Sequence, residues 1–292
     1  MKSLSVTLVL LAWTLGQRCV GGELPQVIEH VKPAIVGIGS FQKLRTPPVS
    51  FIGTGFAVGD GRSIITAAHV IVDLMQGDTP QTIGVLVGLR EVAQFRAASV
   101  VAIDREHDLA HLQINGTPLP VMTLGDSNKV VEGSTLAFTG FPLGMALGLH
   151  HVTHRGMVSA ITPVAMPPVT SRKLEPKLLQ QLQKPVYTVF QLDGTAYPGS
   201  SGSPLYDPDS GLVLGVINMV YIKGLKESAI SNPSGITYAI PSNFIRALLL
   251  GRAQPLPAER LGGGPDAPPR PPQQAPAVQA QQPAAQAVRS GD

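Results

Sequence analysis

Short runs of β-branched and aromatic residues, separated by Gly, Pro, Asp or Asn, recur along most of the chain. Examples are AIVGIG, FIGTGFAV, RSIITA, IGVLVG, STLAFTG, VYTVFQL and VLGVINMVY. Such runs are typical of β-strands, and so many of them with turn residues between favour an all-β barrel or sandwich. Three segments indicate helices instead: PQVIEHVKPA near the start, EPKLLQQLQ at 175–183, and PSNFIRALLLG at 241–251, after the last strand.

The N-terminal segment has the pattern of a secretory signal peptide. It contains an early lysine, an apolar run from Leu4 to Leu15, and small residues that predict cleavage after Gly22. The apolar run is too short to span a bilayer as a helix, so we expect no membrane span once residues 1–22 are removed. A buried first strand or an uncleaved anchor is the alternative.

The C-terminal segment changes composition abruptly. Residues 253–292 are rich in Pro, Ala, Gln and Gly, have no apolar period and carry three acids against three arginines. These features predict a disordered tail. The folded domain is therefore expected over residues 23–252.

Net charge and cysteine content indicate which partners and which cellular location to expect. The net charge of +3 arises from 22 basic and 19 acidic residues without a long basic run, so nucleic acid is not an expected partner. The single cysteine, Cys19, lies within the predicted signal peptide, and the mature chain would have no disulfide. An exported protein of this kind is typical of the bacterial periplasm, so we predict a periplasmic or secreted location.

Three local motifs carry candidate chemistry. His69 follows an apolar strand in GTGFAVGDGRSIITAAHV and is expected in a turn of small residues that faces a cleft. Asp108 stands just before a strand in VVAIDREHDLAHLQI. Ser201 lies between glycines in GSSGSP, where the backbone can turn sharply and bring two N–H groups to one point. Each signal alone is ordinary, but their order and contexts together indicate nucleophilic catalysis.

With these motifs the sequence resembles the trypsin-like serine proteases, and within them the HtrA/Deg branch. The matching pieces are SIITAAHVI, DREHDLAHLQI, FPLG, QLDGTAYPGSSGSPL and GITYAIPSNF, and the resemblance covers roughly residues 26–250. It implies two antiparallel six-stranded β-barrels, the first at about 33–127 and the second at about 128–252, with a short C-terminal helix.

The resemblance also implies the roles of the site residues. Ser201 would be the nucleophile, His69 the general base and Asp108 the residue that orients the histidine, while the N–H groups of Gly199 and Ser201 would form the oxyanion hole. Thr195 would lie at the base of the primary specificity pocket, where it offers no charge to Arg or Lys. The implied activity is endopeptidase cleavage of unfolded or exported proteins, in protein quality control, without a cofactor or metal. A homotrimer is compatible with it, since HtrA relatives commonly form trimers.

The sequence departs from the HtrA pattern in several places. Ser200 and Ser203 stand in GSSGSP where HtrA sequences usually read GNSGGP, and Ser203 either reshapes the loop or impairs the oxyanion hole. No PDZ-like domain is expected after the protease region, and residues 162–185 are expected to form an enlarged loop before the serine motif.

Two rival classes remain. A metalloenzyme is suggested by HDLAH and HHVTH, but the first lies in a strand, and His150 and His154 would be roughly 13 Å apart on a strand. The other rival is a chaperone or binding module that keeps the protease fold with weak or no turnover, for which Ser203 and the loop at 162–185 are the signals.

Overall fold

The computed structural model describes residues 24–75, 81–88, 93–144, 148–164, 187–218 and 236–251. Three segments predicted from the sequence lie outside these residues: the signal peptide at 1–22, the helix at 175–183 and the tail at 253–292. Most of the enlarged loop, from residue 165 onward, also lies outside them.

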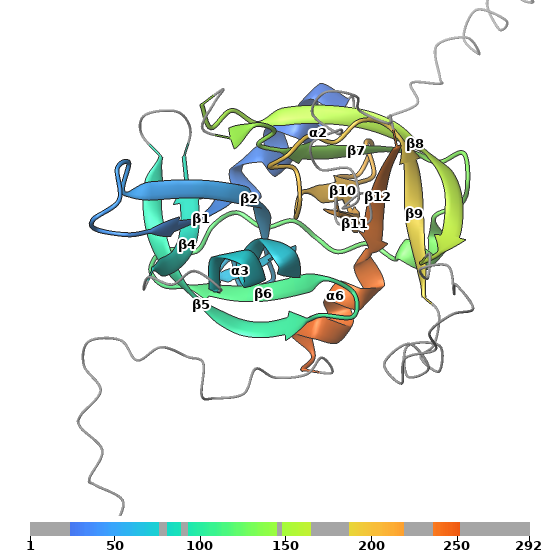
Figure 1. Cartoon of the computed structure of the whole chain (residues 1–292). Helices are drawn as coiled ribbons and strands as arrows, with labels where there is room; N and C mark the ends of the chain where they lie inside the picture. The colour runs from blue at the N-terminus through green and yellow to red at the C-terminus, as the bar shows by residue number, and fades with distance from the viewer. Residues whose placement is uncertain are drawn as a thin grey trace, which may run out of the picture. The chain divides into compact units, whose positions relative to one another are not determined.

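The first half of the described chain closes into a β-barrel (Figure 1). Its strands are β1 (Ile35–Phe41), β2 (Val49–Val58), β3 (Ser63–Ala67), β4 (Thr82–Val87), β5 (Gln94–Asp104) and β6 (Leu109–Ile114). Neighbours pair antiparallel in the order β1-β2-β3-β6-β5-β4, and β4 pairs back with β1. The interior is filled by branched aliphatic side chains, which include those of Val36, Ile38, Ile64 and Leu112.

The second half forms another barrel of the same kind. Its strands are β7 (Thr135–Gly140), β8 (Val152–Pro163), β9 (Thr188–Asp193), β10 (Pro204–Tyr206), β11 (Val213–Asn218) and β12 (Ile236–Pro241), in the order β10-β11-β12-β9-β8-β7. Leu136, Phe138, Val158 and Leu192 lie in its core. The prediction of two antiparallel six-stranded barrels is thus confirmed.

Short helices flank the barrels. They are α2 (Leu24–Val31), which continues into the 3-10 helix η1 (Lys32–Ala34), α3 (Ala68–Met75), the 3-10 helix η3 (Ser127–Lys129), and α6 (Ser242–Leu249). The first and last agree with the helices predicted near the start and after the final strand. Although α6 follows the last strand of the second barrel, it packs against β5 and β6 of the first (Figure 1). The C-terminal helix therefore ties the two barrels together.

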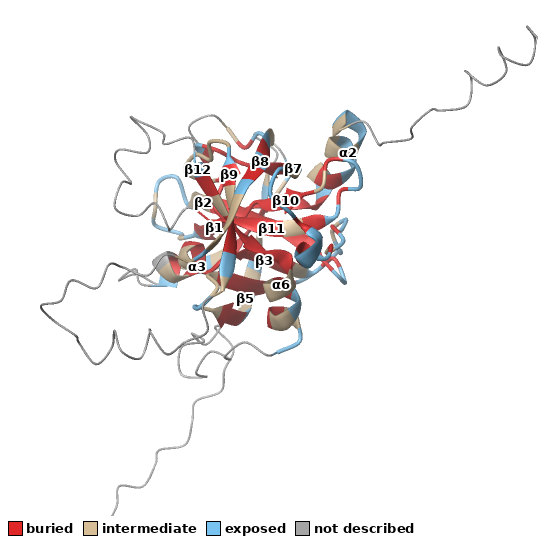
Figure 2. Cartoon of the chain, turned by 90° about the vertical axis from the view of Figure 1, so that its right-hand side faces the viewer, coloured by how far each residue is buried: buried red, intermediate tan, exposed pale blue. Residues whose placement is uncertain are grey.

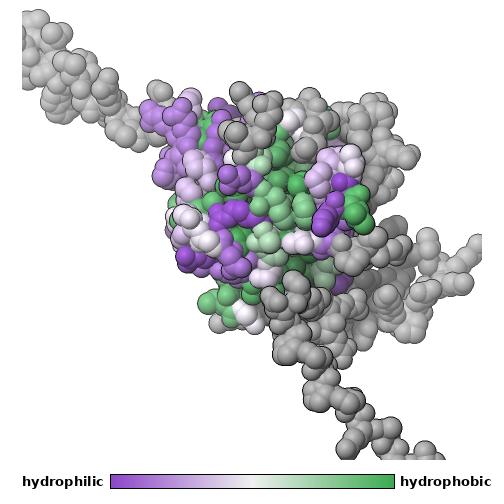
Figure 3. Space-filling view, turned by 90° about the vertical axis from the view of Figure 1, so that its left-hand side faces the viewer, coloured by the Kyte–Doolittle hydropathy of each residue, from purple (hydrophilic) through white to green (hydrophobic). Residues whose placement is uncertain are grey.

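Burial follows the strands rather than the helices. Figure 2 shows buried residues concentrated in the strands of both barrels, with exposed residues on the helices and connecting loops. Figure 3 shows that apolar residues also reach the surface on the side of the first barrel, where hydrophilic residues border them. Among the described helices, none combines the length and apolar character that crossing a bilayer requires.

Candidate active site

His69 is the second residue of helix α3, directly after strand β3. The sequence predicted a turn here, and that prediction is wrong. The helix forms because Val70, Ile71 and Leu74 share one face and bury it in the first barrel. The imidazole therefore projects from the first turn of a packed helix, and its side chain is 14% exposed.

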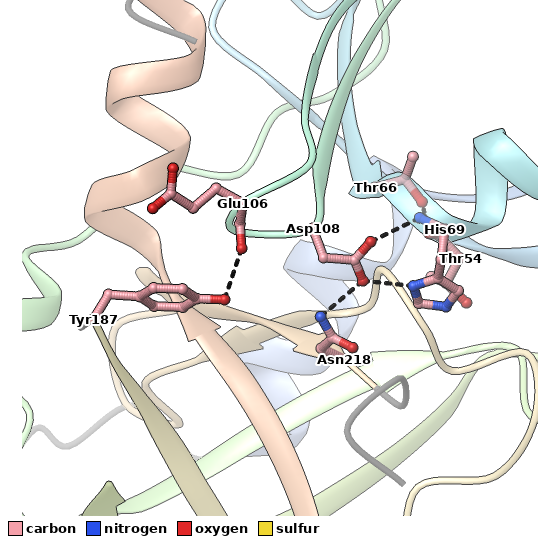
Figure 4. A network of polar contacts seen from close by, with 7 residues as sticks. All are labelled: Thr54, Thr66, His69, Glu106, Asp108, Tyr187 and Asn218. Carbon is pink, nitrogen blue, oxygen red and sulfur yellow. Dashed lines mark hydrogen bonds and ion pairs between the residues drawn. The ribbon is translucent and has the colours of Figure 1, made fainter. Parts of the chain in front are cut away.

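The Asp108 carboxylate accepts three hydrogen bonds (Figure 4). The His69 Nδ1 lies 2.6 Å from Oδ2, and the His69 backbone N–H donates to Oδ1 at 2.8 Å. The Asn218 side-chain amide, from the end of β11, donates to Oδ2 at 2.8 Å. Because an ionised carboxylate only accepts, the His69 proton resides on Nδ1, and Nε2 keeps a free lone pair.

The loop that carries Asp108 is held by aromatic contacts from the second barrel. The His107 ring stacks on Phe244 of α6 at a centroid distance of 3.8 Å and meets the Tyr187 ring edge-on at 4.5 Å. The Tyr187 hydroxyl donates to the Glu106 carbonyl at 2.8 Å (Figure 4). Asp108 itself has a left-handed backbone with φ of +53°, a conformation that residues other than glycine adopt rarely.

Asp104 caps the same loop. Its carboxylate accepts from the Glu106 and His107 backbone N–H groups and lies 2.7 Å from the His107 Nδ1. Burial opposes ionisation, but the hydrogen bonds from the His107 side chain and backbone hold the pKa of Asp104 below its usual value. The loop before Asp108 is thus fixed by Asp104 as well as by the aromatic contacts of His107.

Ser201 is the second residue of the latter of two consecutive tight turns. The Ser200 N–H donates to the Tyr197 carbonyl at 2.9 Å, with Pro198 second and Gly199 third in the turn, and Gly199 has φ of +97°. This is the pattern of a type II turn, which needs glycine at its third position. A second such turn follows, because the Ser203 N–H donates to the Ser200 carbonyl at 3.0 Å and Gly202 has φ of +87°.

The second turn is hydrogen-bonded to both barrels, to β2 of the first and to β11 of the second. The Thr54 N–H of β2 donates to the Ser201 carbonyl at 2.9 Å, and the Gly202 N–H donates to the Ile217 carbonyl at 2.9 Å. A side chain at Gly202 would collide with the Thr54 carbonyl and would lie 3.1 Å from the Ala67 nitrogen. Gly202 is thereby held against the end of β3, two residues before His69 of α3, and Ser201 is 6% exposed.

The N–H groups of Gly199 and Ser201 are the expected oxyanion donors. Neither donates a hydrogen bond to another residue that the structure describes. The Pro198 carbonyl accepts from the Leu143 N–H at 2.7 Å. Since the C=O and N–H of a trans peptide point in opposite directions, the Gly199 N–H points away from Leu143.

Thr195 lies in a segment fastened to β12. The Thr237 hydroxyl donates to the Gly194 carbonyl at 2.6 Å and accepts from the Ala196 N–H at 2.9 Å. These two bonds fix the backbone on both sides of Thr195. The position predicted for the pocket base is therefore rigidly placed beside the serine turn.

Ser200 and Ser203, the departures from the HtrA motif, are buried. Over the described chain the hydroxyl of each lacks a hydrogen-bond partner. The Ser203 Oγ lies against Gly140 of β7, in the space that a side chain there would take. Ser203 thus packs into the second barrel, and its backbone N–H still closes the turn.

The histidines of HDLAH and HHVTH are separated by the fold. His107 faces Asp104 and Phe244, whereas His111 is buried in β6. His151 lies 3.1 Å from the Ile35 carbonyl, and His154 stacks on Phe138. Within the described ranges no three His, Cys, Asp or Glu side chains are grouped so that they could hold a metal ion.

One buried and two half-buried histidines predict a loss of stability in mild acid. Burial lowers the pKa of His111, His151 and His154, so the unfolded chain binds protons here more readily than the folded one. Stability is therefore greatest above the unfolded pKa and falls as the pH drops below it. We expect Tm to decrease between about pH 7.5 and about pH 5.5, and His154→Phe to make that decrease smaller. Parallel Tm curves for the variant and the parent protein would contradict this.

Sequence reasoning missed Asn218 and Thr237. Both are polar residues within apolar strand runs, VLGVINMVY and GITYAI, and both are at most 1% exposed. A buried polar side chain needs a hydrogen-bond partner, which is the signal that could have marked them. Their partners, at Asp108 and at residues 194–196, are distant in sequence.

A family model described as "Trypsin-like peptidase domain" matches residues 53–216 of the chain. A probable periplasmic serine endoprotease DegP-like from Halomonas elongata is 27% identical over 230 residues, which are 76% of this chain and 40% of the relative. A protein of the same description from Pseudomonas fluorescens is 26% identical over 279 residues, 80% of this chain and 51% of the relative. The chain thus spans about half, or less, of the length of these relatives.

Among solved structures, the fold is similar to that of an HtrA-type protease AlgW with decapeptide. The TM-score is 0.55 at 20% identity, and the match covers 78% of this chain and 68% of the other.

Proposed function

Because this chain belongs to the trypsin-like peptidase family, we propose that it is a serine endopeptidase of the HtrA type that hydrolyses unfolded polypeptides. The observation that carries the proposal is the Asp108 carboxylate, which orients His69 through Nδ1 at 2.6 Å while two further donors hold it in place. A carboxylate fixed in this way sets the tautomer that leaves Nε2 available as a base.

In the proposed reaction, Ser201 Oγ attacks the carbonyl carbon of the scissile peptide while His69 Nε2 takes the hydroxyl proton. The tetrahedral intermediate collapses as its C–N bond breaks and His69 returns the proton to the leaving amine. Water then attacks the acyl carbon while His69 takes its proton; the ester C–O bond to Ser201 breaks and His69 returns the proton to Ser201 Oγ, which releases the carboxylic acid. Asp108 stabilises the imidazolium that forms in both steps.

The oxyanion of each tetrahedral intermediate would be bound by the Gly199 and Ser201 N–H groups. The hydrogen bond from Leu143 to the Pro198 carbonyl supports this role, because it turns the Gly199 N–H to the opposite side. Two donors that form no bond with the described protein remain for the substrate. Each donor of this kind contributes on the order of 3 kcal/mol to transition-state binding.

Exported or unfolded proteins are the proposed substrates, in periplasmic quality control. The periplasmic relatives and the signal-like N-terminus support this location. A homotrimer belongs to the proposal as well, and sedimentation of the purified protein measures it.

Hydrolysis of unfolded casein by the full chain tests the proposal. We expect peptide release by the parent protein and none by Ser201→Ala. Binding of casein without cleavage by the parent protein would instead favour the binding module.

We expect cleavage after Val, Ala, Ile or Leu. Cleavage after Arg or Lys should be poor. Thr195 offers no negative charge to a basic side chain, and an apolar pocket discriminates weakly, by about 1–3 kcal/mol per methylene. Mapping the cleavage sites in casein by mass spectrometry measures the preference. Cutting predominantly after basic residues would refute the assignment of Thr195 to the pocket base.

A further inference from the structure

Thr54 of β2 is fully buried and connects the first barrel to the serine turn through both its backbone and its side chain. Its hydroxyl donates to the Gly199 carbonyl at 2.7 Å and accepts from the Phe141 N–H at 3.1 Å. Its carbonyl accepts from the Thr66 hydroxyl at 2.7 Å, and Figure 4 draws both threonines in the same view as His69. One side chain thus joins β2 to the second barrel at Gly199 and Phe141.

The bond to Gly199 controls a flexible point of the backbone. Two peptide planes meet at Gly199: the plane before it is held by Leu143 and the plane after it by Thr54. Glycine rotates freely between conformations that other residues avoid, so a peptide beside it is held in one orientation only by its hydrogen bonds. Fixing both planes fixes the direction of the Gly199 N–H.

The backbone supplies only part of this restraint, through the Ser200 N–H of the same peptide, which donates to the Tyr197 carbonyl at 2.9 Å. Within the described chain, no backbone N–H donates to the Gly199 carbonyl, and the Thr54 hydroxyl is its donor. The turn cannot move away easily either, because Gly202 touches the Thr54 carbonyl and the Thr54 N–H binds the Ser201 carbonyl. The Thr54 hydroxyl therefore restrains a serine turn that other contacts already hold in place.

We infer that Thr54 is a positioning residue for the oxyanion hole: its hydroxyl holds the Gly199–Ser200 peptide, and thereby the backbone at Gly199, so that the N–H of the preceding peptide faces the substrate. This inference rests on the proposed endopeptidase function and deepens it. Thr54 acts through Gly199 and does not contact the substrate. Its loss should weaken binding of the tetrahedral intermediate more than binding of the peptide, and so lower kcat while leaving KM largely unchanged.

The test compares Thr54→Val with Thr54→Ser in the full chain, using a peptide substrate and measuring kcat, KM and Tm. Valine keeps the shape and removes the hydroxyl, whereas serine keeps the hydroxyl. Since loss of a whole oxyanion donor costs about 100-fold to 1,000-fold, misorientation by Thr54→Val should lower kcat by about 10-fold or more, with KM within about 2-fold. Thr54→Ser should restore kcat to within about 3-fold of the parent value.

Thr139→Val is the matched control. Thr139 is also fully buried, and its hydroxyl bonds to Thr153 and Tyr206 inside the second barrel. Its replacement should lower Tm as Thr54→Val does, but leave kcat within about 2-fold, because buried hydroxyls of this kind contribute to stability alone. This comparison separates positioning from a general loss of stability.

Three results would overturn the inference. They are an unchanged kcat in Thr54→Val, an equal loss of kcat in Thr139→Val, and no recovery of kcat in Thr54→Ser. In each of them the parent enzyme still cleaves, so the proposed function stands. A parent protein that fails to cleave, like Ser201→Ala, refutes the proposed function, and the inference falls with it. If Thr54→Val does not fold, Thr54→Cys replaces it, because a thiol is only a weak donor; an unchanged kcat there overturns the inference equally.

Discussion

Ser201→Ala is expected to abolish peptide hydrolysis, with kcat falling by about 10⁶-fold, while Tm stays near the parent value. Ser201 lies in a turn whose shape depends on backbone hydrogen bonds and on Gly199 and Gly202, not on the Ser201 hydroxyl. Removing one oxygen therefore removes the proposed nucleophile and leaves the turn intact. Initial rates on a peptide substrate and thermal melting measure the two quantities.

Neighbouring hydroxyls provide the control for that substitution. Ser200→Ala and Ser203→Ala should keep substantial activity, because both hydroxyls are buried and have no chemical role in the proposed reaction. A serine-directed organophosphonate should label Ser201 in the parent protein, and a chelator should leave the rate unchanged. Activity that survives in Ser201→Ala and disappears with the chelator would support the metalloenzyme instead.

Asp108→Asn is expected to lower kcat by about 10⁴-fold without unfolding the protein. The Asp108 carboxylate accepts from three donors, and an amide in its place would present its own NH₂ to one of them. His69 would then lose the bond that selects its tautomer. The left-handed backbone at residue 108 suits asparagine about as well as aspartate, so the loop should keep its shape.

Asp104→Asn is the matched control, four residues earlier in the same loop. Asp104 pairs with His107 through Nδ1 at 2.7 Å, a geometry close to that of Asp108 with His69. It lies outside the proposed reaction, so kcat should stay within about 3-fold, as expected for a substitution that leaves the reacting groups in place. Equal losses in the two variants would mean that Asp108 acts only by holding the loop.

The sequence predicted those parts of the molecule whose signals are local. β-branched runs predicted the strands of both barrels except β10, which lies in the stretch interpreted as the serine turn; turn residues mark the ends of the runs. His69, Asp108 and Ser201 could be named because each stands in a recognisable local context. The structure brings His69 and Asp108 into contact and bonds the Ser201 turn to β2 of the barrel that carries them.

The parts that escaped prediction depend on contacts between distant segments. Asn218 reaches Asp108 across 110 residues, and Thr54 reaches Gly199 across 145. Nothing near Asn218 or Thr54 in the sequence specifies these partners. Helix α3 was missed for a related reason, because tertiary burial of its apolar face outweighs the small residues that favoured a turn before it.

Because α6 packs against the first barrel, the residues around Asp108 become available in a fixed order during synthesis. A polypeptide is synthesised from its N-terminus, so His69 and Asp108 exist long before Asn218 on β11 and Phe244 on α6. Until those late segments arrive, the Asp108 carboxylate lacks its amide donor, and the ring of His107 lacks the surface on which it stacks. A chain still emerging from the ribosome therefore carries the early site residues without the completed site, and assembly of that site waits for the last helix.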